Sequence, residues 1–293
     1  MRCWQMRTLS DQRVILLSRR SGLQIFRDHG IAGGVNMKPK IAFFDFASCE
    51  GCQLAILNCE DILLDILNLV DIVEFREAIS EMGSRYDVAF IEGSIHRDED
   101  IQRLQKIRKR STYLVAMGAC ACNGNVQGRS NFVAPAENFK VVYGEDARNS
   151  VQVDPEYWPL WAHTRVRSVE DIVKVDFHLR GCPVVPTEFL HLVKSLLNGT
   201  QPETPAQAVC VECKKNGNEC VFDRGETCLG PIIWGGCDSV CTNNGYSCDG
   251  CRGTLPYANL EAHRQLLLDK GLDEKDITSR YRLFCSTEAV AAD

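Results

Sequence analysis

Short apolar runs alternate with amphipathic stretches through residues 39–199. The apolar runs have the length of buried strands, and the amphipathic stretches repeat their apolar residues at helical spacing. This alternation predicts parallel strands joined by right-handed helical crossovers, which is an open doubly wound α/β sheet. The predicted strands are residues 41–46, 71–75, 87–95, 112–118 and 175–181, and the predicted helices are residues 53–70, 98–109 and 186–197.

The pattern changes on both sides of this region. Residues 200–208 form a Pro-rich linker, and eight cysteines then fall between Cys210 and Cys251 among glycines, asparagines and few apolar residues. We expect that segment to bury no core and to be organised by what its cysteines hold. The pattern of residues 259–272, which ends with a glycine stop, predicts a closing helix.

The first 36 residues are basic and show no clean period. We interpret residues 1–36 as a disordered extension or a wrongly assigned start, with Met37 as the true first residue. The domains predicted are then 37–199 for the sheet and 200–293 for the cysteine-rich part. Residues 18–24 (SRRSGLQ) are similar to a twin-arginine export signal, but the charged IFRDHG that follows disfavours export and favours a cytoplasmic protein.

Composition limits the function further. The 293 residues carry a net charge of −6 without a basic stripe, which disfavours nucleic-acid binding. The longest apolar stretch, residues 56–73, is interrupted by acidic residues, so no membrane span is expected. Sixteen cysteines are unusual. A chain of this size can build a core without disulfides, so metal binding is the better interpretation.

Four cysteines follow predicted strands and form what we call the sheet-edge set: Cys49, Cys52, Cys120 and Cys182. Parallel strands end at one edge, so these thiols should converge there. Four thiolates bind either zinc or a cubane iron–sulfur cluster. Glycines near Cys120 and the proline after Cys182 favour the cluster, and the alternative is that Cys120 and Cys182 are buried core thiols.

The cysteine-rich segment contains two further sets in chain order. The first tail set is Cys210, Cys213, Cys220 and Cys228, and the second tail set is Cys237, Cys241, Cys248 and Cys251. Two zinc ribbons are an alternative for these eight thiols, and a disulfide framework is disfavoured in the cytoplasm. Three sets of four suit a line of electron-carrying clusters better than three structural zinc ions.

Other chemistry-bearing residues give weaker signals. The remaining cysteines are Cys3, Cys59, Cys122 and Cys285, of which Cys59 is expected in the core and Cys3 lies in the extension. The histidines His96, His163, His178, His191 and His263 lack ligand spacing and are expected in core or surface roles. We expect Glu50 and Glu92 to lie beside the sheet-edge set. There they would relay protons or bond the surroundings of a cluster, and the alternative is that each carboxylate only caps a helix or stabilises a turn. No catalytic acid, base or nucleophile stands out.

Several motifs together carry a family resemblance. SCEGCQ, EGSI (residues 92–95), GACA (118–121) and GCPVVP (181–186) resemble the small subunit of nickel–iron hydrogenases and the related cluster subunit of respiratory NADH:quinone oxidoreductase. The tail motifs ETCLGPI (226–232) and CDGCRG (248–253) are similar to the cytoplasmic branch, which includes sulfhydrogenase delta subunits and the small subunits of F420-reducing or heterodisulfide-reductase-linked hydrogenases. The resemblance covers about residues 38–284.

The resemblance implies a flavodoxin-like domain followed by a small ferredoxin-like domain, with three 4Fe-4S clusters. The sheet-edge set would hold the proximal cluster, the second tail set the medial one and the first tail set the distal one. The nickel–iron centre would lie in a partner large subunit, because this chain lacks the paired C-x2-C motifs that the family leads one to expect around nickel. Electrons would pass on to a further partner subunit carrying FAD, another flavin or more iron–sulfur clusters.

Two positions depart from the family pattern. The resemblance leads us to expect Gly-Gly after GACA, where this chain has Gly124 and Asn125, so the loop should differ near the large subunit. Relatives with oxygen-tolerant proximal clusters carry extra cysteines at the positions of Gly51 and Asn125 here, so that special cluster is not inferred. A respiratory subunit, which usually lacks the eight-cysteine tail, and a zinc-binding interaction protein remain alternatives. The sequence does not name the terminal electron acceptor.

Overall fold

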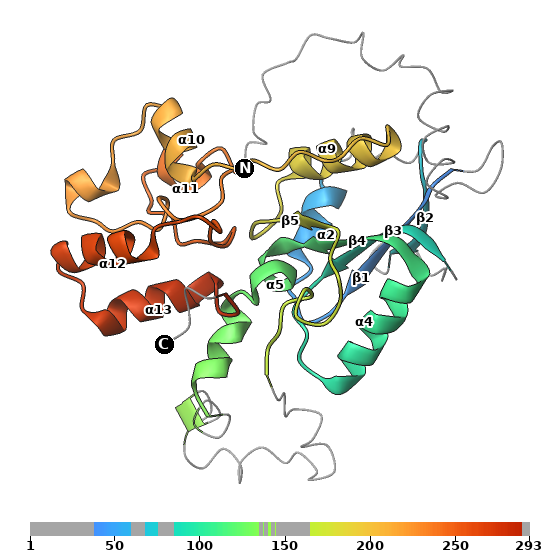
Figure 1. Ribbon diagram of the computed structural model, residues 1–293, viewed down its shortest axis with the longest axis horizontal. Helices are drawn as coiled ribbons and strands as arrows, with labels where there is room; N and C mark the ends of the chain where they lie inside the picture. The colour runs from blue at the N-terminus through green and yellow to red at the C-terminus, as the bar shows by residue number, and fades with distance from the viewer. Residues whose placement is uncertain are drawn as a thin grey trace.

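The computed structural model describes residues 38–59, 68–75, 85–134 and 165–288, together with positions 137, 140, 141 and 144. The N-terminal extension, Cys3 and His163 lie outside the described residues. The chain forms a parallel α/β sheet domain and a smaller cysteine-rich domain beside it (Figure 1). No described helix has the length and apolar character needed to cross a membrane.

The sheet has five parallel strands among the described residues, in the order β2-β1-β3-β4-β5. The strands are β1 (Lys40–Asp45), β2 (Asp71–Phe75), β3 (Tyr86–Glu92), β4 (Ser111–Met117) and β5 (Phe177–Leu179). This is the flavodoxin order, in which the chain direction across the sheet reverses between β1 and β3. Ligands of such sheets bind beyond the carboxyl ends of the strands at that point. The predicted doubly wound fold is confirmed.

Helices cover both faces of the sheet, and each strand buries alternate side chains on opposite faces. Phe43 and Phe90 pack with α2 (Gly51–Leu57) and α9 (Pro186–Leu197) on one face. Phe44 and Ile91 pack with α4 (Asp98–Arg110) on the other face. Figure 1 shows α4 on the opposite side of the sheet from α9. Both faces are buried, which explains why the strands read as continuous apolar runs.

The cysteine-rich domain corrects one expectation, because it does bury a core. Its elements are α10 (Val209–Lys215), η3 (Val221–Arg224), α11 (Val240–Asn243), α12 (Leu260–Asp269) and α13 (Glu274–Phe284). Leu229 and Ile233 from the cysteine-rich loops pack against Leu267 of α12 and Ile277 of α13. The apolar residues of the segment are too few alone, and the two closing helices supply the rest of a small third core.

Several predicted boundaries also change. The helix predicted over residues 53–70 is α2 and ends at Leu57, and positions 60–67 lie outside the described residues. Cys59 is therefore not on that helix, and it is partly exposed rather than core. The closing helix predicted over residues 259–272 is α12, and α13 was not predicted. Two short elements after β4, α5 (Gly118–Asn123) and η1 (Val126–Phe132), were also missed.

Candidate functional site

The sheet-edge set comes from three loops at the carboxyl ends of the strands. Cys49 and Cys52 follow β1, Cys120 lies in α5 directly after β4, and Cys182 follows β5. Burial raises the pKa of Cys120 and of Cys182, and negative charge on Cys49 would raise both further. The pKa of Cys52 is raised by burial and, to a lesser extent, by charge on Glu92 and Cys120. The four thiols are therefore close enough to act on one another electrostatically.

Local backbone geometry positions the pair Cys49 and Cys52. Glu92, at the end of β3, is buried and accepts hydrogen bonds from the backbone N–H groups of Cys52 (3.0 Å) and Gln53 (3.2 Å). A carboxylate at this place satisfies donors of the first turn of α2 and complements its dipole. Of the two roles expected for Glu92, the structure gives it the capping contacts. Glu50 lies in the left-handed region (φ 60°) just before α2.

Gly118 allows α5 to start against the sulfur of Cys52. Its φ is +86°, and a Cβ at this position would lie 2.4 Å from Cys52 Sγ. No side chain fits in that space, and L-residues rarely adopt that backbone conformation. The sequence GACA thus brings Cys120 to the edge because its first residue has no side chain.

Two amide side chains face the sulfurs. Asn125 Nδ2 donates to Cys120 Sγ at 3.0 Å and approaches Cys182 Sγ at 3.7 Å. Gln127 Nε2 lies 3.4 Å from Cys120 Sγ and also donates to the carbonyl of Ala47 at 3.1 Å. The Asn125 amide opposes the effect of burial on the pKa of both cysteines. Neither amide was predicted as a site residue.

The first tail set gathers around α10, which contains Cys210 and Cys213, and around η3, which lies between Cys220 and Cys228. Burial raises the pKa of Cys210 to about 12, and charge on Cys228, Cys213 and Cys220 would add to the rise. The backbone N–H of Gly230 lies 3.4 Å from Cys228 Sγ. These four thiols form a second electrostatically coupled group with backbone donors pointed at sulfur.

The second tail set gathers in the same way. Burial raises the pKa of Cys251 to about 12, with smaller contributions from Cys237 and Cys241. Burial also raises the pKa of Cys248 well above its usual value, with charge on Cys228 of the first tail set adding more to the rise than charge on Cys251 or Cys237. These contacts are compatible with the grouping predicted from chain order, which stays a prediction.

The three sets touch one another in series. Arg252, the residue after Cys251, donates from Nη1 to the carbonyl of Arg180 at 2.7 Å, and the Cys182 backbone is among the groups that lower the pKa of Cys251, which links the sheet-edge set to the second tail set. The backbone N–H of Cys248 lies 3.3 Å from Cys228 Sγ, which links the second tail set to the first. The second tail set is thus the middle one.

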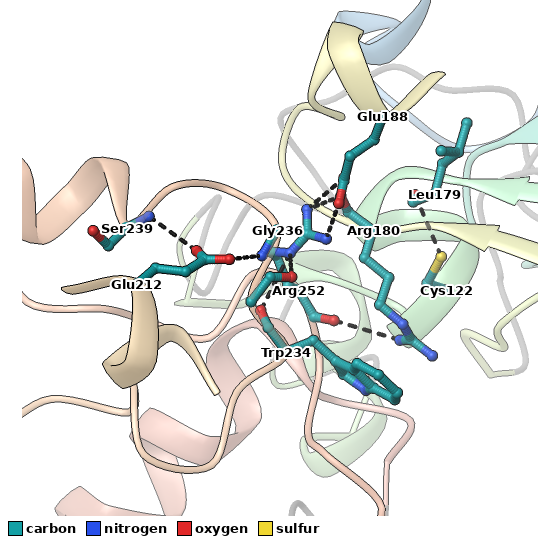
Figure 2. A network of polar contacts seen from close by, with 10 residues as sticks. Cys122, Leu179, Arg180, Glu188, Glu212, Trp234, Gly236, Ser239 and Arg252 are labelled. Carbon is teal, nitrogen blue, oxygen red and sulfur yellow. Dashed lines mark hydrogen bonds and ion pairs between the residues drawn. The ribbon is translucent and has the colours of Figure 1, made fainter. Parts of the chain in front are cut away.

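A buried polar network runs between these sets (Figure 2). Arg252, next to Cys251, forms a two-pronged ion pair with Glu188 of α9 at 2.8 and 2.9 Å. Its guanidinium also donates to the carbonyls of Arg180 and Gly235, both at 2.7 Å. Glu212, between Cys210 and Cys213, accepts hydrogen bonds from the backbone N–H groups that flank Cys237, those of Gly236 and Ser239.

The remaining thiols and histidines have structural contacts. Cys122 is a buried residue of α5 with its Sγ 3.5 Å from the Ala116 carbonyl oxygen, and Cys285 lies in the third core. His263 is buried, with Nε2 3.0 Å from the Cys228 carbonyl oxygen and Nδ1 2.8 Å from the Tyr281 hydroxyl. Burial lowers the pKa of His263. The core role expected for a histidine fits His263.

The donor sets have the chemistry that an iron–sulfur cluster requires. Every described cysteine is a free thiol, so no disulfide competes for these sulfurs in that part of the chain. No group of three or more His, Cys, Asp or Glu side chains among the described residues is arranged to hold a single metal ion. A four-iron cluster makes a different demand, because each thiolate binds a different iron of a cage. The thiols must lose their protons on binding, and the N–H donors stabilise the resulting thiolates.

Comparisons with known proteins agree with this picture. Residues 49–196, just over half of the chain, match the family described as NADH ubiquinone oxidoreductase, 20 Kd subunit. The sulfhydrogenase 2 subunit delta of Pyrococcus furiosus is 33% identical over 84% of this chain and 98% of its own length. A subunit of the F420-non-reducing hydrogenase vhu of Methanocaldococcus jannaschii is 30% identical, over 75% of this chain and 83% of its own length.

A solved structure is also similar. The crystal structure of an NAD+-reducing [NiFe]-hydrogenase in the H2-reduced state contains a chain that is 27% identical, with a TM-score of 0.50. The match covers 57% of this chain and 96% of that chain. Relatives matched along both domains are hydrogenase subunits, so the resemblance carried by the motifs is confirmed. The chain therefore belongs to the family of the 20 Kd subunit of NADH ubiquinone oxidoreductase, and within that family it is a small subunit of the hydrogenase type.

Proposed function

We propose that this chain is the electron-transfer subunit of a nickel–iron hydrogenase and that it carries three 4Fe-4S clusters in line. The sheet-edge set would hold the proximal cluster through Cys49, Cys52, Cys120 and Cys182. The second tail set would hold the medial cluster and the first tail set the distal one. Each cluster, when bound, supplies one-electron redox chemistry.

The serial contact between the three sets carries this proposal. Arg252, next to Cys251, bonds to the carbonyl of Arg180 near Cys182, and the N–H of Cys248 lies against Cys228 Sγ, so a path along the sets would use neighbouring proposed ligands at both steps. Three structural zinc sites would have no need of such an order. The same contacts support the medial and distal assignments.

The chain's own residues would hold these groups and adjust them. Backbone N–H groups of Gly230 and Cys248 point at Cys228 Sγ, and Asn125 Nδ2 points at Cys120 Sγ. Hydrogen bonds to sulfur stabilise the more negative state and so raise the reduction potential. Burial of the thiols excludes water from the same sites.

Partner subunits complete the proposed enzyme. Hydrogen would be split or formed at a nickel–iron centre in a large subunit packed on the sheet edge beside the proximal set. The distal set would pass electrons to a subunit with flavin, such as FAD, or with more iron–sulfur clusters. Similarity to a chain of an NAD+-reducing hydrogenase favours NAD(P) as one candidate acceptor. A cytoplasmic location goes with this proposal.

The respiratory alternative is less favourable because of the tail. The family match ends at residue 196, before all eight tail cysteines, whereas the sulfhydrogenase delta subunit is matched over 98% of its length. Both tail sets in this chain are ordered around a core of their own. The tail therefore supports the hydrogenase branch.

Metal analysis tests the proposal. The complex, purified without oxygen, should contain about twelve iron and twelve sulfide in this chain, four of each per cubane cluster. It should be brown and bleach on reduction. A colourless protein with bound zinc would favour the zinc-binding interaction protein. About eight iron would remove one cluster from the proposal.

A further inference from the structure

Asn125 stands out among the residues around the sheet-edge set. It is 4% exposed and lies at φ 52° and ψ −157°, a backbone conformation that strongly favours glycine. Its Nδ2 reaches the sulfurs of Cys120 (3.0 Å) and Cys182 (3.7 Å), which come from different loops. A single amide group therefore bridges two of the four sulfurs.

The contacts of Asn125 indicate that the amide is held there for its N–H group. Its side-chain oxygen, Oδ1, is buried and has no hydrogen-bond partner among the described residues. An unpaired buried carbonyl is destabilising, so the side chain is retained at a cost. The sulfurs are the acceptors that its Nδ2 reaches.

The loop is also fixed from behind. The hydroxyl of Ser286, just beyond α13, donates to the backbone carbonyl of Asn125 at 2.9 Å. Thr287 N donates to the Asn123 carbonyl at 3.3 Å, and Asn123 Nδ2 donates to the Phe284 carbonyl at 3.0 Å. The end of the cysteine-rich domain therefore holds the Asn125 loop in place against the sheet-edge set.

We propose that Asn125 is a positioning residue that raises the reduction potential of the sheet-edge cluster by donating its side-chain N–H to Cys120 and Cys182. The inference rests on the proposed proximal cluster. When that cluster gains an electron, the sulfurs become more negative and the N–H dipole stabilises the reduced state more than the oxidised one. Gln127 should contribute less, because its Nε2 is shared with the Ala47 carbonyl.

The test replaces Asn125 by glycine in the intact complex. Glycine removes the donor and accepts φ 52°, so Asn125→Gly should leave folding unharmed. The potential of the proximal EPR signal should become more negative. We expect the equilibrium constant of one-electron reduction to fall by up to about tenfold, which is about 59 mV. Iron and sulfide content, measured first, should equal that of the unmodified complex.

A control in the same loop separates tuning from loop stability. Asn131 Nδ2 and Oδ1 bond to the backbone of Val166 and not to sulfur. Asn131→Ala should lower the thermal midpoint and leave the proximal potential unchanged. Asn125→Gly should instead make the proximal potential more negative and leave the thermal midpoint unchanged. The isosteric Asn125→Asp should lower the potential further, because a carboxylate replaces the donor.

Three results would overturn the inference, and one concerns the proposed function instead. An unchanged potential in Asn125→Gly with full iron content would show that the amide does not act on the cluster. An equal shift in Asn131→Ala would assign the effect to loop loosening. Loss of the cluster in both Asn125→Gly and Asn125→Asp would make Asn125 an assembly residue. Absence of a proximal iron signal in the unmodified complex would instead refute the proposed function.

Discussion

Arg252→Met should loosen the contact between the two domains far more than its position on a loop would suggest. The Arg252 side chain is 4% exposed and that of Glu188 is 19% exposed, so their ion pair is largely shielded from water (Figure 2). Removing the cation leaves a buried carboxylate without its partner, which costs about 3–5 kcal/mol. The three carbonyls that accept from Arg252, those of Arg180, Trp234 and Gly235, also lose a donor. These losses are coupled to that of the ion pair, so they do not simply add to its cost.

Amide hydrogen exchange in the intact complex measures this effect. A cost of about 3 kcal/mol or more raises the local opening equilibrium more than about a hundredfold, at 1.4 kcal/mol per tenfold. The amides of Trp234 and Gly235, whose N–H groups bond the carbonyls of Gly253 and Gln207, report the opening. Arg264→Met is the matched control, because Arg264 is 39% exposed and its pairs with Glu261 and Glu274 lie at the surface. Its cost should be below about 1 kcal/mol.

The effect should depend on pH in a definite direction. Burial raises the pKa of Glu188 above its ordinary value of 4.5, and the bonds from Arg252 oppose that rise. Without Arg252 the folded pKa rises further, so Glu188 takes up a proton when the contact closes. The closed state then gains stability as the pH falls through the raised folded pKa towards 4.5, and loses it at neutral pH. Protection in Arg252→Met should therefore recover on acidification, after correction for intrinsic exchange. Equal exchange in Arg252→Met and Arg264→Met at neutral pH would refute the reasoning.

Two further substitutions test the cysteine sets separately. Gly118→Ala should lower the iron content from about twelve to about eight per chain by removing the proximal cluster, because the new methyl group would meet Cys52 Sγ. Gly245→Ala is the control, since Gly245 has a similar φ of +82° and nothing within 4 Å of an added Cβ. Retained iron in Gly118→Ala would contradict this. Cys241→Ser should keep hydrogen–deuterium exchange activity, which needs only the nickel centre of the partner, and lose hydrogen-dependent reduction of the acceptor. Survival of both activities would show that Cys241 is not a ligand.

Local periodicity was enough to predict the sheet. The apolar runs ending near Phe46, Phe75 and Gly118 are strands, and they follow one another in parallel. Once the strands are parallel, Cys52, Cys120 and Cys182 must lie at one edge, whatever the strand order. The sheet-edge set could therefore be predicted from the amino-acid sequence alone.

Periodicity could not predict the core of the cysteine-rich domain. Within residues 210–251 apolar residues such as Leu229 and Ile233 are sparse, and a window of sequence shows too few to fill a core. Their partners Leu267 and Ile277 lie on α12 and α13, beyond that window. The sequence of α13 is strongly charged, with apolar positions only at its buried stripe, so it resembled a surface segment.

The polar contacts around the cysteines were beyond prediction for another reason. Arg252 and Glu188 are separated by 64 residues, and nothing in either local sequence names the other. The sequence marks Asn125 only as a departure from the family pattern, and the direction of its side chain towards two sulfurs depends on a φ of 52° that sequence does not specify. Cysteine spacing predicts the ligands, whereas the groups that would tune them become visible only in three dimensions.

Polar contacts also bear on the order of the two tail sets. We expect the medial cluster in the second tail set, although the first tail set follows the linker directly and connectivity alone would place Cys210 nearest the sheet domain. The structure instead brings Cys251 against Cys182, and Arg252, the next residue, binds both Glu188 and the Arg180 carbonyl. The loop from Cys248 to Gly253 is thus held between the domains by a buried cation, and the linker lets the first tail set lie on the far side. The buried ion pair beside Cys251 therefore helps to hold the second tail set against the sheet domain, in the middle of the proposed electron path.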